Sequence, residues 1–305
     1  MRIAIVSDIH GNLTALEAVL ADLRQTSPDL ILHGGDLADS GSSPVEIVDR
    51  IRDLGWQGVV GNTDEMLFAP ETLEAFASRS PGLELLWNAV REMAEAAREA
   101  LGEDRLCWLR DLPRMQIEGP LALLHASPES AWRAPASQCT DAELELAYEL
   151  VKQPVIVYGH IHRPFIRRIE DSKIPGRLVL NSGSVGQSHD GDPRAAYLLL
   201  DDSSPTVRRV EYDIDRELKA LSICGLPHAD WISKIIQSAA PGKCSEDRKN
   251  MPDSCTILPW QSSCRLRPRG MLLRANTAWR SSEPASDMPA KVALVAESRF
   301  GGNLC

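Results

Sequence analysis

The sequence lacks the cysteine patterns of disulfide-rich and zinc-ribbon proteins. Its 305 residues include seven cysteines, an odd number, and no two of them are spaced as Cys-x-x-Cys. Zinc ribbons use that spacing, and small disulfide frameworks use an even set of cysteines. We therefore expect neither a structural zinc site nor a disulfide framework.

Long hydrophobic runs are missing as well. No apolar stretch approaches the roughly 18 residues of a membrane-spanning helix, and the first residues show no basic region followed by a cleavage site. The sequence thus predicts a cytoplasmic protein without a membrane partner. Its hydrophobic content of 43% and charged content of 25% are those of an ordinary globular protein.

Basic residues are scarce in most of the chain, which has a formal net charge of −10. Residues 241–305 carry ten Lys or Arg and six Asp or Glu, which leaves a net charge of −14 for residues 1–240. An acidic body disfavours binding to the phosphates of nucleic acids, so nucleic acid is not an expected partner.

Composition also divides the chain near residue 241. Residues 241–305 contain six prolines and eight serines and show no sustained helical or strand period. Such segments rarely bury enough apolar surface to offset the entropy lost on ordering. The sequence predicts one domain over residues 1–240 and a disordered or loosely attached tail over 241–305. Binding of a partner or an anionic surface is the alternative interpretation of this basic tail.

Five apolar runs in the domain are each followed by polar residues that could bind a metal. In open α/β sheets, ligands bind outside the carboxyl ends of the strands, so these motifs are predicted to line one site. Residues two apart at a strand end, such as His160 and His162, point the same way. The runs are residues 3–6, 30–32, 59–60, 121–124 and 154–158, and the polar residues after them are Asp8 and His10, Asp36, Asn62 and Asp64, His125, and His160 and His162.

Helical periodicity separates the first three of these runs, at residues 12–24 and 44–54. This alternation predicts parallel strands joined by crossovers. Residues 65–112 then form a helix-rich insertion, which could either overhang the site as a cap or pack against the sheet. Later strands, the last at 207–212, follow with short connections, which indicates mixed pairing in a second sheet.

The candidate metal ligands are all oxygen or nitrogen donors. Sites that mix imidazole and carboxylate suit borderline divalent ions, so we expect Mn²⁺ first, with Fe, Zn²⁺, Co²⁺ or Ni²⁺ as alternatives. The seven candidates are Asp8, His10, Asp36, Asn62, His125, His160 and His162.

The order of these motifs is Asp-x-His, Gly-Asp, Gly-Asn, His and Gly-His-x-His, which resembles the calcineurin-like metallophosphoesterase superfamily. The likeness is strongest to its small bacterial and archaeal phosphodiesterase-like branch, whose late signature resembles residues 181–187 and 190–194. It covers residues 1–239. The resemblance implies an α/β fold, a four-layer α/β/β/α sandwich of two mixed sheets with a helical insertion. The metal centre would lie at the edge where strand ends of both sheets meet.

The resemblance also implies how the ligands are shared between two divalent ions. Asp36 would bridge the ions, with Asp8, His10 and His162 on one and Asn62, His125 and His160 on the other. Four protein ligands per ion leave positions open for water and substrate. Two neighbouring ions acidify a shared water, so the expected nucleophile is a bridging hydroxide that attacks in line, with Asp36, Asn62 and His125 around it. No protein nucleophile is needed, and the sequence has no Gly-x-Ser-x-Gly elbow or P-loop.

Other polar residues near the motifs have supporting assignments. Asp64 is expected to accept a hydrogen bond from a ligand histidine or a backbone group. Asn12 either caps the first helix or orients the substrate. Gly183, in the late signature, is expected to shape the backbone of a loop near the metals and to contact the substrate. His189, in the loop 187–193, is expected to reach a phosphate at the rim of the site. His33 ends a strand but has no role in the family, so it is predicted to be structural.

Two departures from the family pattern narrow the substrate. Ser40 stands where the protein phosphatase branch has a phosphate-binding arginine, which weakens the case for phosphoprotein substrates. Thr63 stands where many relatives have a histidine able to act as general acid. We therefore predict a metal-dependent phosphodiesterase that acts on a small phosphoester or nucleotide-type substrate. A phosphomonoesterase or dinucleoside polyphosphate hydrolase is one alternative, and a non-catalytic metal-binding interaction scaffold is the other.

Overall fold

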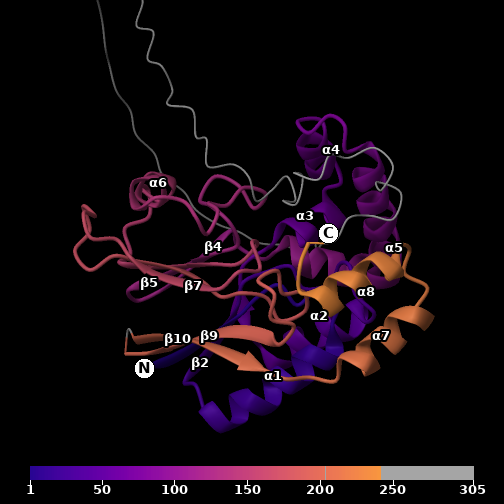
Figure 1. Ribbon diagram of the computed structural model, residues 1–305, viewed down its shortest axis with the longest axis horizontal. Coiled ribbons are helices and arrows are strands. Elements are labelled where there is room, and N and C mark those ends of the chain that lie inside the picture. The colour runs from indigo at the N-terminus through magenta and orange to yellow at the C-terminus, as the bar shows by residue number, and fades with distance from the viewer. Residues whose placement is uncertain (203, 242–305) are drawn as a thin grey trace, which may run out of the picture. The chain divides into compact units, whose positions relative to one another are not determined.

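The computed structural model describes residues 1–202 and 204–241. The predicted tail lies outside the described residues, apart from its first residue. Within these ranges, ten strands form two five-stranded sheets, and eight helices accompany them (Figure 1). No helix in the two ranges is long and apolar enough to cross a membrane.

The first sheet has the strand order β10-β9-β1-β2-β3. Its three parallel strands, β1 to β3, are joined by the crossover helices α1 (Leu13–Thr26) and α2 (Pro44–Leu54). The antiparallel pair β9 and β10 lies beside β1. The strands are β1 (Arg2–Val6), β2 (Leu30–His33), β3 (Gln57–Gly58), β9 (Ala195–Asp201) and β10 (Ser204–Val210).

The second sheet has the strand order β4-β5-β6-β8-β7. Its three central strands are parallel, and the two edge strands are antiparallel to their neighbours, so this sheet is mixed as predicted. The strands are β4 (Met115–Glu118), β5 (Leu121–Leu124), β6 (Val155–Tyr158), β7 (Phe165–Arg168) and β8 (Leu178–Asn181).

Side chains of the central strands alternate between two faces and so define the layers. Ile3 and Ile5 of β1 share one core, between the sheets, with Leu121 and Leu123 of β5. The intervening residues of β1 face helices such as α1, and those of β5 face α6 (Asp141–Ala147). Figure 1 shows α1 below the lower sheet and α6 above the upper one. The predicted four-layer sandwich is confirmed.

The predicted helical insertion is present and serves both of the purposes considered for it. It consists of α3 (Asn62–Phe68), α4 (Glu71–Ala77) and α5 (Glu84–Arg110). Helix α5 packs on the core of the first sheet and also lines a pocket at the strand ends through Trp87 and Met93. Two further helices, α7 (Ile214–Ile223) and α8 (Ala229–Ser238), contribute to the same core.

Three details of the strands differ from the sequence prediction. The sequence predicts the last two strands, up to residue 212, in the second sheet, but they are β9 and β10 and extend the first sheet by antiparallel pairing beside β1. The predicted strand at residues 59–60 is wrong: β3 ends at Gly58, and although Val59 still donates its N–H to His33 O at 3.1 Å, Val60 donates to Pro113 O at 3.0 Å instead of to β2. The edge strands β4 and β7 are not predicted at all. Each has only four residues, none of them buried, so their sequences carry little strand signal.

Candidate metal centre

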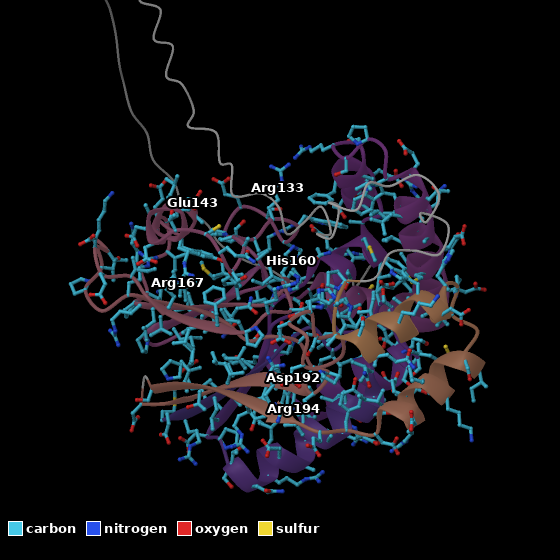
Figure 2. The ribbon with its side chains drawn as sticks, viewed as in Figure 1. Arg133, Glu143, His160, Arg167, Asp192 and Arg194 are labelled. Carbon is cyan, nitrogen blue, oxygen red and sulfur yellow. The ribbon has the colours of Figure 1, made fainter. Side chains whose placement is uncertain are left out.

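The seven predicted ligands meet at the carboxyl ends of strands from both sheets. Backbone hydrogen bonds join the loops that carry them: Asp8 N–H donates to Gly35 O at 3.0 Å, and Gly159 N–H donates to His125 O at 3.0 Å. None of the seven ligand residues is more than 6% exposed. Figure 2 shows one of them, His160, well inside the molecule. The strand-end motifs therefore form one buried site, as the sequence predicts.

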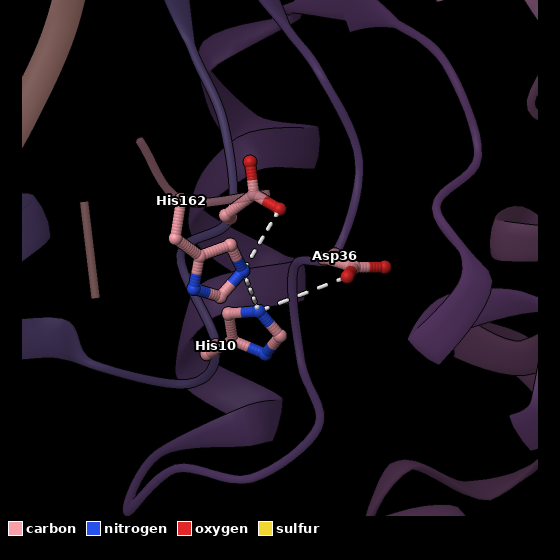
Figure 3. Close-up of side chains that lie close together, drawn as sticks. His10, Asp36 and His162 are labelled. Carbon is pink, nitrogen blue, oxygen red and sulfur yellow. Dashed lines mark hydrogen bonds and ion pairs between the residues drawn. The ribbon is translucent and has the colours of Figure 1, made fainter. Parts of the chain in front are cut away.

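Two imidazoles on the first side of the site point lone pairs at each other. Nδ1 of His10 lies 3.1 Å from Asp39 O, and Nδ1 of His162 lies 2.6 Å from Gln187 O. A carbonyl oxygen can only accept, so each ring carries its proton on Nδ1 and has a lone pair on Nε2. The two Nε2 atoms are 3.2 Å apart (Figure 3). A bound cation resolves this contact between two acceptors.

Carboxylates complete the first group of donors. His162 Nε2 lies 3.2 Å from Asp8 Oδ1, and His10 Nε2 lies 3.7 Å from Asp36 Oδ2 (Figure 3). Asp8 is held by the backbone N–H of His160, which donates to its Oδ1 at 2.9 Å, and by Ser7 Oγ, which donates to Oδ2 at 2.6 Å. Two imidazole nitrogens and two carboxylate oxygens thus converge, which is a donor set suited to a borderline divalent ion.

A second group of acceptors lies on the other side of Asp36. When its ring is neutral, as metal binding requires, His125 donates from Nδ1 to Gly34 O at 2.8 Å, which leaves a lone pair on Nε2. This Nε2 lies 2.9 Å from Asn62 Oδ1 and 3.3 Å from Asp36 Oδ2, and His160 Nδ1 lies 2.8 Å from the same Asn62 oxygen. Without a cation, the Asn62 amide would gain by turning over to donate to both imidazoles, so the inward oxygen is the orientation that suits a bound ion.

Asp36 belongs to both groups. One cluster of potential ligand atoms comprises Asp8, His10, Asp36 and His162, and the other comprises Asp36, His125 and His160. Asp36 Oδ2 lies 3.7 Å from His10 Nε2 of the first cluster and 3.3 Å from His125 Nε2 of the second. Asp36 Oδ1 accepts the N–H of Thr63 at 2.8 Å. The residues present therefore fit two ions with Asp36 between them, although the assignment of each ligand to an ion stays a prediction.

The site carries an excess of buried negative charge. Asp8, Asp36, Asp39 and Asp64 are all at most 2% exposed, and no Lys or Arg of the described ranges forms an ion pair with any of them. Buried charges need partners, so the carboxylates create a demand for positive charge. Burial lowers the pKa of His125, but the charge and hydrogen bond of Asp36, the charge of Asp8 and the hydrogen bond to Gly34 together outweigh burial and raise that pKa to about 9. A proton bound to His125 thus supplies positive charge that a bound metal ion would otherwise supply to the site.

Asp64 fastens the loop that carries Asp36. Its Oδ2 accepts the backbone N–H of Asp36 at 2.7 Å and that of Gly61 at 3.1 Å, and its Oδ1 accepts the N–H of Leu37 at 2.8 Å. Burial and the charge of Asp36 raise the pKa of Asp64 to about 6, although these backbone donors oppose the rise. The predicted contact with backbone groups is therefore present, and it sets the position of the residue shared by both groups.

The backbone of the site is unusual in a way that the motifs do not reveal. L-residues rarely adopt positive φ, and such strain accumulates at functional sites where the surrounding structure enforces it. Gly35, at φ +85°, has no room for a side chain, because a Cβ would lie 2.4 Å from Gly61 N. Positive φ values between 49° and 67° occur at five of the ligands: Asp8, His10, Asp36, His160 and His162.

A pocket opens on five of the seven predicted ligands, which are His10, Asp36, Asn62, His160 and His162. It encloses about 620 Å³ including its open mouth, and its lining includes Thr63, Ser40 and His189 beside the ligands. His189 is buried and stacks on His162 with ring centroids 4.3 Å apart, and its predicted contact with the substrate stays a prediction. The apolar part of the lining includes Trp87 and other side chains from α3, α5 and α8.

Asn12 and Gly183 have structural roles, and neither lines the pocket. Asn12 Oδ1 accepts the N–H of Ala15 at 2.9 Å as the cap of α1, and its Nδ2 donates to Gly186 O at 3.2 Å. Gly183 has φ +76° and packs so closely that a Cβ would lie 2.8 Å from the side chain of Ala196. These contacts explain both residues structurally, and their predicted contacts with substrate stay predictions.

Sequence reasoning missed several residues that build the site. Asp39 and Gln187 orient the first pair of histidines through their backbone carbonyls, a role that any residue type can fill and no motif reveals. Burial and the charges of Asp36 and Asp64 raise the pKa of Asp39 to about 7, against the hydrogen bond from Ser40. The apolar part of the pocket lining was missed too, because it is assembled from distant segments.

The family assignment rests on a match to the model of the calcineurin-like phosphoesterase superfamily domain, which spans residues 1–204. The chain belongs to this superfamily. An uncharacterised protein of Methanocaldococcus jannaschii is 30% identical over 252 residues, which are 77% of this chain and 96% of that protein. The crystal structure of a metallophosphoesterase from Sphaerobacter thermophilus is similar with a TM-score of 0.64 and 28% identity, covering 79% of this chain and all of that one.

Two relatives with named activities match a smaller part. A symmetrical bis(5'-nucleosyl)-tetraphosphatase of Methylococcus capsulatus is 30% identical over 148 residues, or 48% of this chain and 50% of that protein. A probable cyclic nucleotide phosphodiesterase of Synechococcus is 28% identical over 167 residues, or 49% of this chain and 64% of that protein. Each likeness spans about half of this chain.

Proposed function

We propose that this protein hydrolyses a phosphodiester with the help of two divalent metal ions. The observation that carries the proposal is the pair of Nε2 lone pairs of His10 and His162, 3.2 Å apart and next to carboxylates. Together with the second group around His125, they form a donor set with Asp36 in common. Mn²⁺ is our first choice of ion, with Fe, Zn²⁺, Co²⁺ or Ni²⁺ as alternatives.

When bound, two such ions supply an acidified water and a clamp for phosphoryl oxygens. The chain's own residues make this possible by holding the donors still. The carbonyls of Asp39 and Gln187 fix the tautomer and orientation of His10 and His162, and Asp64 fixes the loop of Asp36. The apolar part of the pocket lining limits the access of bulk water to the substrate.

The charge of the pocket favours a diester over more highly charged esters. Among the described residues that line it, none is Lys or Arg, and Ser40 occupies the position of the expected arginine. A phosphodiester carries one negative charge, whereas a monoester or a polyphosphate chain needs additional cations. The named relatives leave dinucleoside polyphosphate hydrolysis as the second candidate, because one of them is a tetraphosphatase.

Metal analysis combined with a panel of substrates tests the proposal. The metal-free protein is reloaded with each of the five metals, and turnover is measured for bis(p-nitrophenyl) phosphate, p-nitrophenyl phosphate and diadenosine tetraphosphate. We expect about two ions per chain and the highest kcat/KM for the diester. A preference for the tetraphosphate would favour the second candidate. Tight metal binding without turnover of any ester would favour an interaction scaffold.

A further inference from the structure

We propose that Trp87, Trp132 and Trp231, which we call the tryptophan wall, bind a flat aromatic group of the substrate, such as a nucleobase or an aryl ring. The inference rests on the proposed function, because it places the phosphate at the metal ligands. It goes beyond that function by naming the chemical class of the ester group. Three of the five tryptophans in the described ranges line this one pocket, together with five of the seven predicted metal ligands.

The lining of the pocket is mixed in polarity. Its lining includes acidic and imidazole groups of the metal centre, and also the tryptophan wall with aliphatic residues such as Ile232 and Ile235. Pockets for small ligands are mainly apolar, with a few polar groups that fix orientation. The matching ligand therefore has a charged end and a flat apolar end, as an aromatic phosphodiester does.

The wall is held in place before any ligand binds. Phe76 of α4 packs against Trp132 with ring centroids 5.2 Å apart and meets Trp87 edge-on at 5.8 Å. Trp132 also donates from Nε1 to Glu65 Oε2 at 3.0 Å, and Arg114 forms an ion pair with the same glutamate. A rigid aromatic surface loses little entropy on binding a flat ring, so it favours stacking over alkyl contacts.

Binding of reaction products tests the inference independently of turnover. Adenosine 5'-monophosphate and ribose 5-phosphate carry the same phosphate and sugar, and only the first has a base. We expect the Mn²⁺-loaded full chain to bind the nucleotide at least about tenfold more tightly, with quenching of tryptophan fluorescence. Equal dissociation constants for the two ligands would overturn the inference.

Variants of one tryptophan locate the effect. Trp132→Leu removes the ring and should abolish most of the tenfold preference, whereas Trp132→Phe keeps a flat ring and should retain most of it. Trp108→Leu is the matched control, because Trp108 lies near His33 and does not line the pocket, and it should leave the preference unchanged. An equal loss in the Trp132→Leu and Trp108→Leu proteins would contradict a role for the wall.

The inference and the proposed function fail in different ways. If the protein cleaves no diester with any metal, the proposed function is wrong, whatever the product affinities are. If it cleaves dimethyl phosphate as readily as a diester with one aromatic group, after allowance for the leaving group, the metal chemistry stands and the tryptophan wall has no role in recognition.

Discussion

The metal centre and the tryptophan wall line the same pocket, yet they are encoded in very different ways. Each metal ligand lies just beyond a strand, within a short motif that can be read along the chain. Trp87, Trp132 and Trp231 lie in α5, in the loop after β5 and in α8, without a shared pattern. Metal ligands at strand ends can therefore be predicted from short motifs, whereas a surface formed by the packing of distant helices cannot.

The largest effect should come from the residue on which both halves of the metal centre depend. Asp36→Asn removes a charge and leaves an amide where an oxygen faces both His10 and His125. Loss of the clamp on the phosphoryl group is worth several kcal/mol, so kcat should fall by about a thousandfold or more. Metal content, measured by elemental analysis, should fall as well.

Asp104→Asn is the control for this change, because Asp104 is an exposed aspartate whose side chain is 80% accessible and pairs only with Arg52 in the described structure. It should keep full activity and full metal content. Near-normal turnover with two bound ions in the Asp36→Asn protein would contradict the central role of Asp36, because the shared carboxylate would then be dispensable.

The next effect concerns the departure of the leaving group. A positioned general acid contributes roughly 10²–10⁴-fold. Thr63 lines the pocket, and an alkyl hydroxyl is too weak an acid for this role at neutral pH. The rate should therefore depend steeply on the leaving group, with acidic phenols favoured over alcohols.

The measurement is a plot of log kcat/KM against the pKa of the leaving group, for diesters that all carry one constant aryl ester. Thr63→His should flatten the plot if the new ring reaches the leaving oxygen. Thr63→Val is the matched control, since it keeps the size and removes the hydroxyl. A slope near zero in the native protein would mean that another group, such as His189 in the same pocket, protonates the leaving oxygen.

The fold was largely predictable from hydrophobic pattern and from the family resemblance. Runs such as residues 3–6 and 121–124 have strong β propensity and are buried on both faces, so they stand out as strands. The edge strands β4 and β7 do not, because half-exposed residues alternate there over only four positions. The end of β3 depends on a hydrogen bond from Val60 to Pro113, far along the chain, which no local pattern encodes.

The metal ligands of the site could be predicted from the sequence, but the groups that hold those ligands in place could not. All seven predicted ligands come together, because their motifs place them at one edge. The carbonyls of Asp39 and Gln187 act through the backbone, so their side chains carry no signal. Asn12 was open between two roles on sequence alone, and only the hydrogen bond from Ala15 shows that it caps α1.

A smaller effect is expected for Asp64, which is not a predicted metal ligand but holds the loop of Asp36 in position. Asp64→Asn leaves one carbonyl oxygen and puts an NH₂ group against backbone N–H donors of Asp36, Leu37 or Gly61. Removing such a support typically costs 10–100-fold in metal affinity, or in activity, which is roughly what we expect here. Titration with Mn²⁺ measures the change, again with Asp104→Asn as control. Unaltered affinity would show that the loop of Asp36 holds its position without Asp64.

The smallest expected effect is on the pH dependence of stability, and it concerns His33, a buried histidine that is not a predicted metal ligand. His33 is fully buried, and neither ring nitrogen has a hydrogen-bond partner among the described residues. Burial lowers its pKa to about 3. In the unfolded chain the ring binds a proton below about pH 6.5, while in the folded protein it stays neutral, so stability is lost as the pH falls through 6.5.

His33→Leu should remove this dependence and leave metal content unchanged. Between pH 7.5 and 5.5 the native protein should lose about 1.4 kcal/mol more in its free energy of unfolding than the variant does. The measurement is urea unfolding of both metal-free proteins at the two pH values. His228→Gln, which changes a histidine paired with Glu92 at 2.9 Å near the surface, is the control for removal of a histidine as such. If His33→Leu instead lowers metal content, His33 belongs functionally to the metal centre, and its prediction as a structural histidine is wrong.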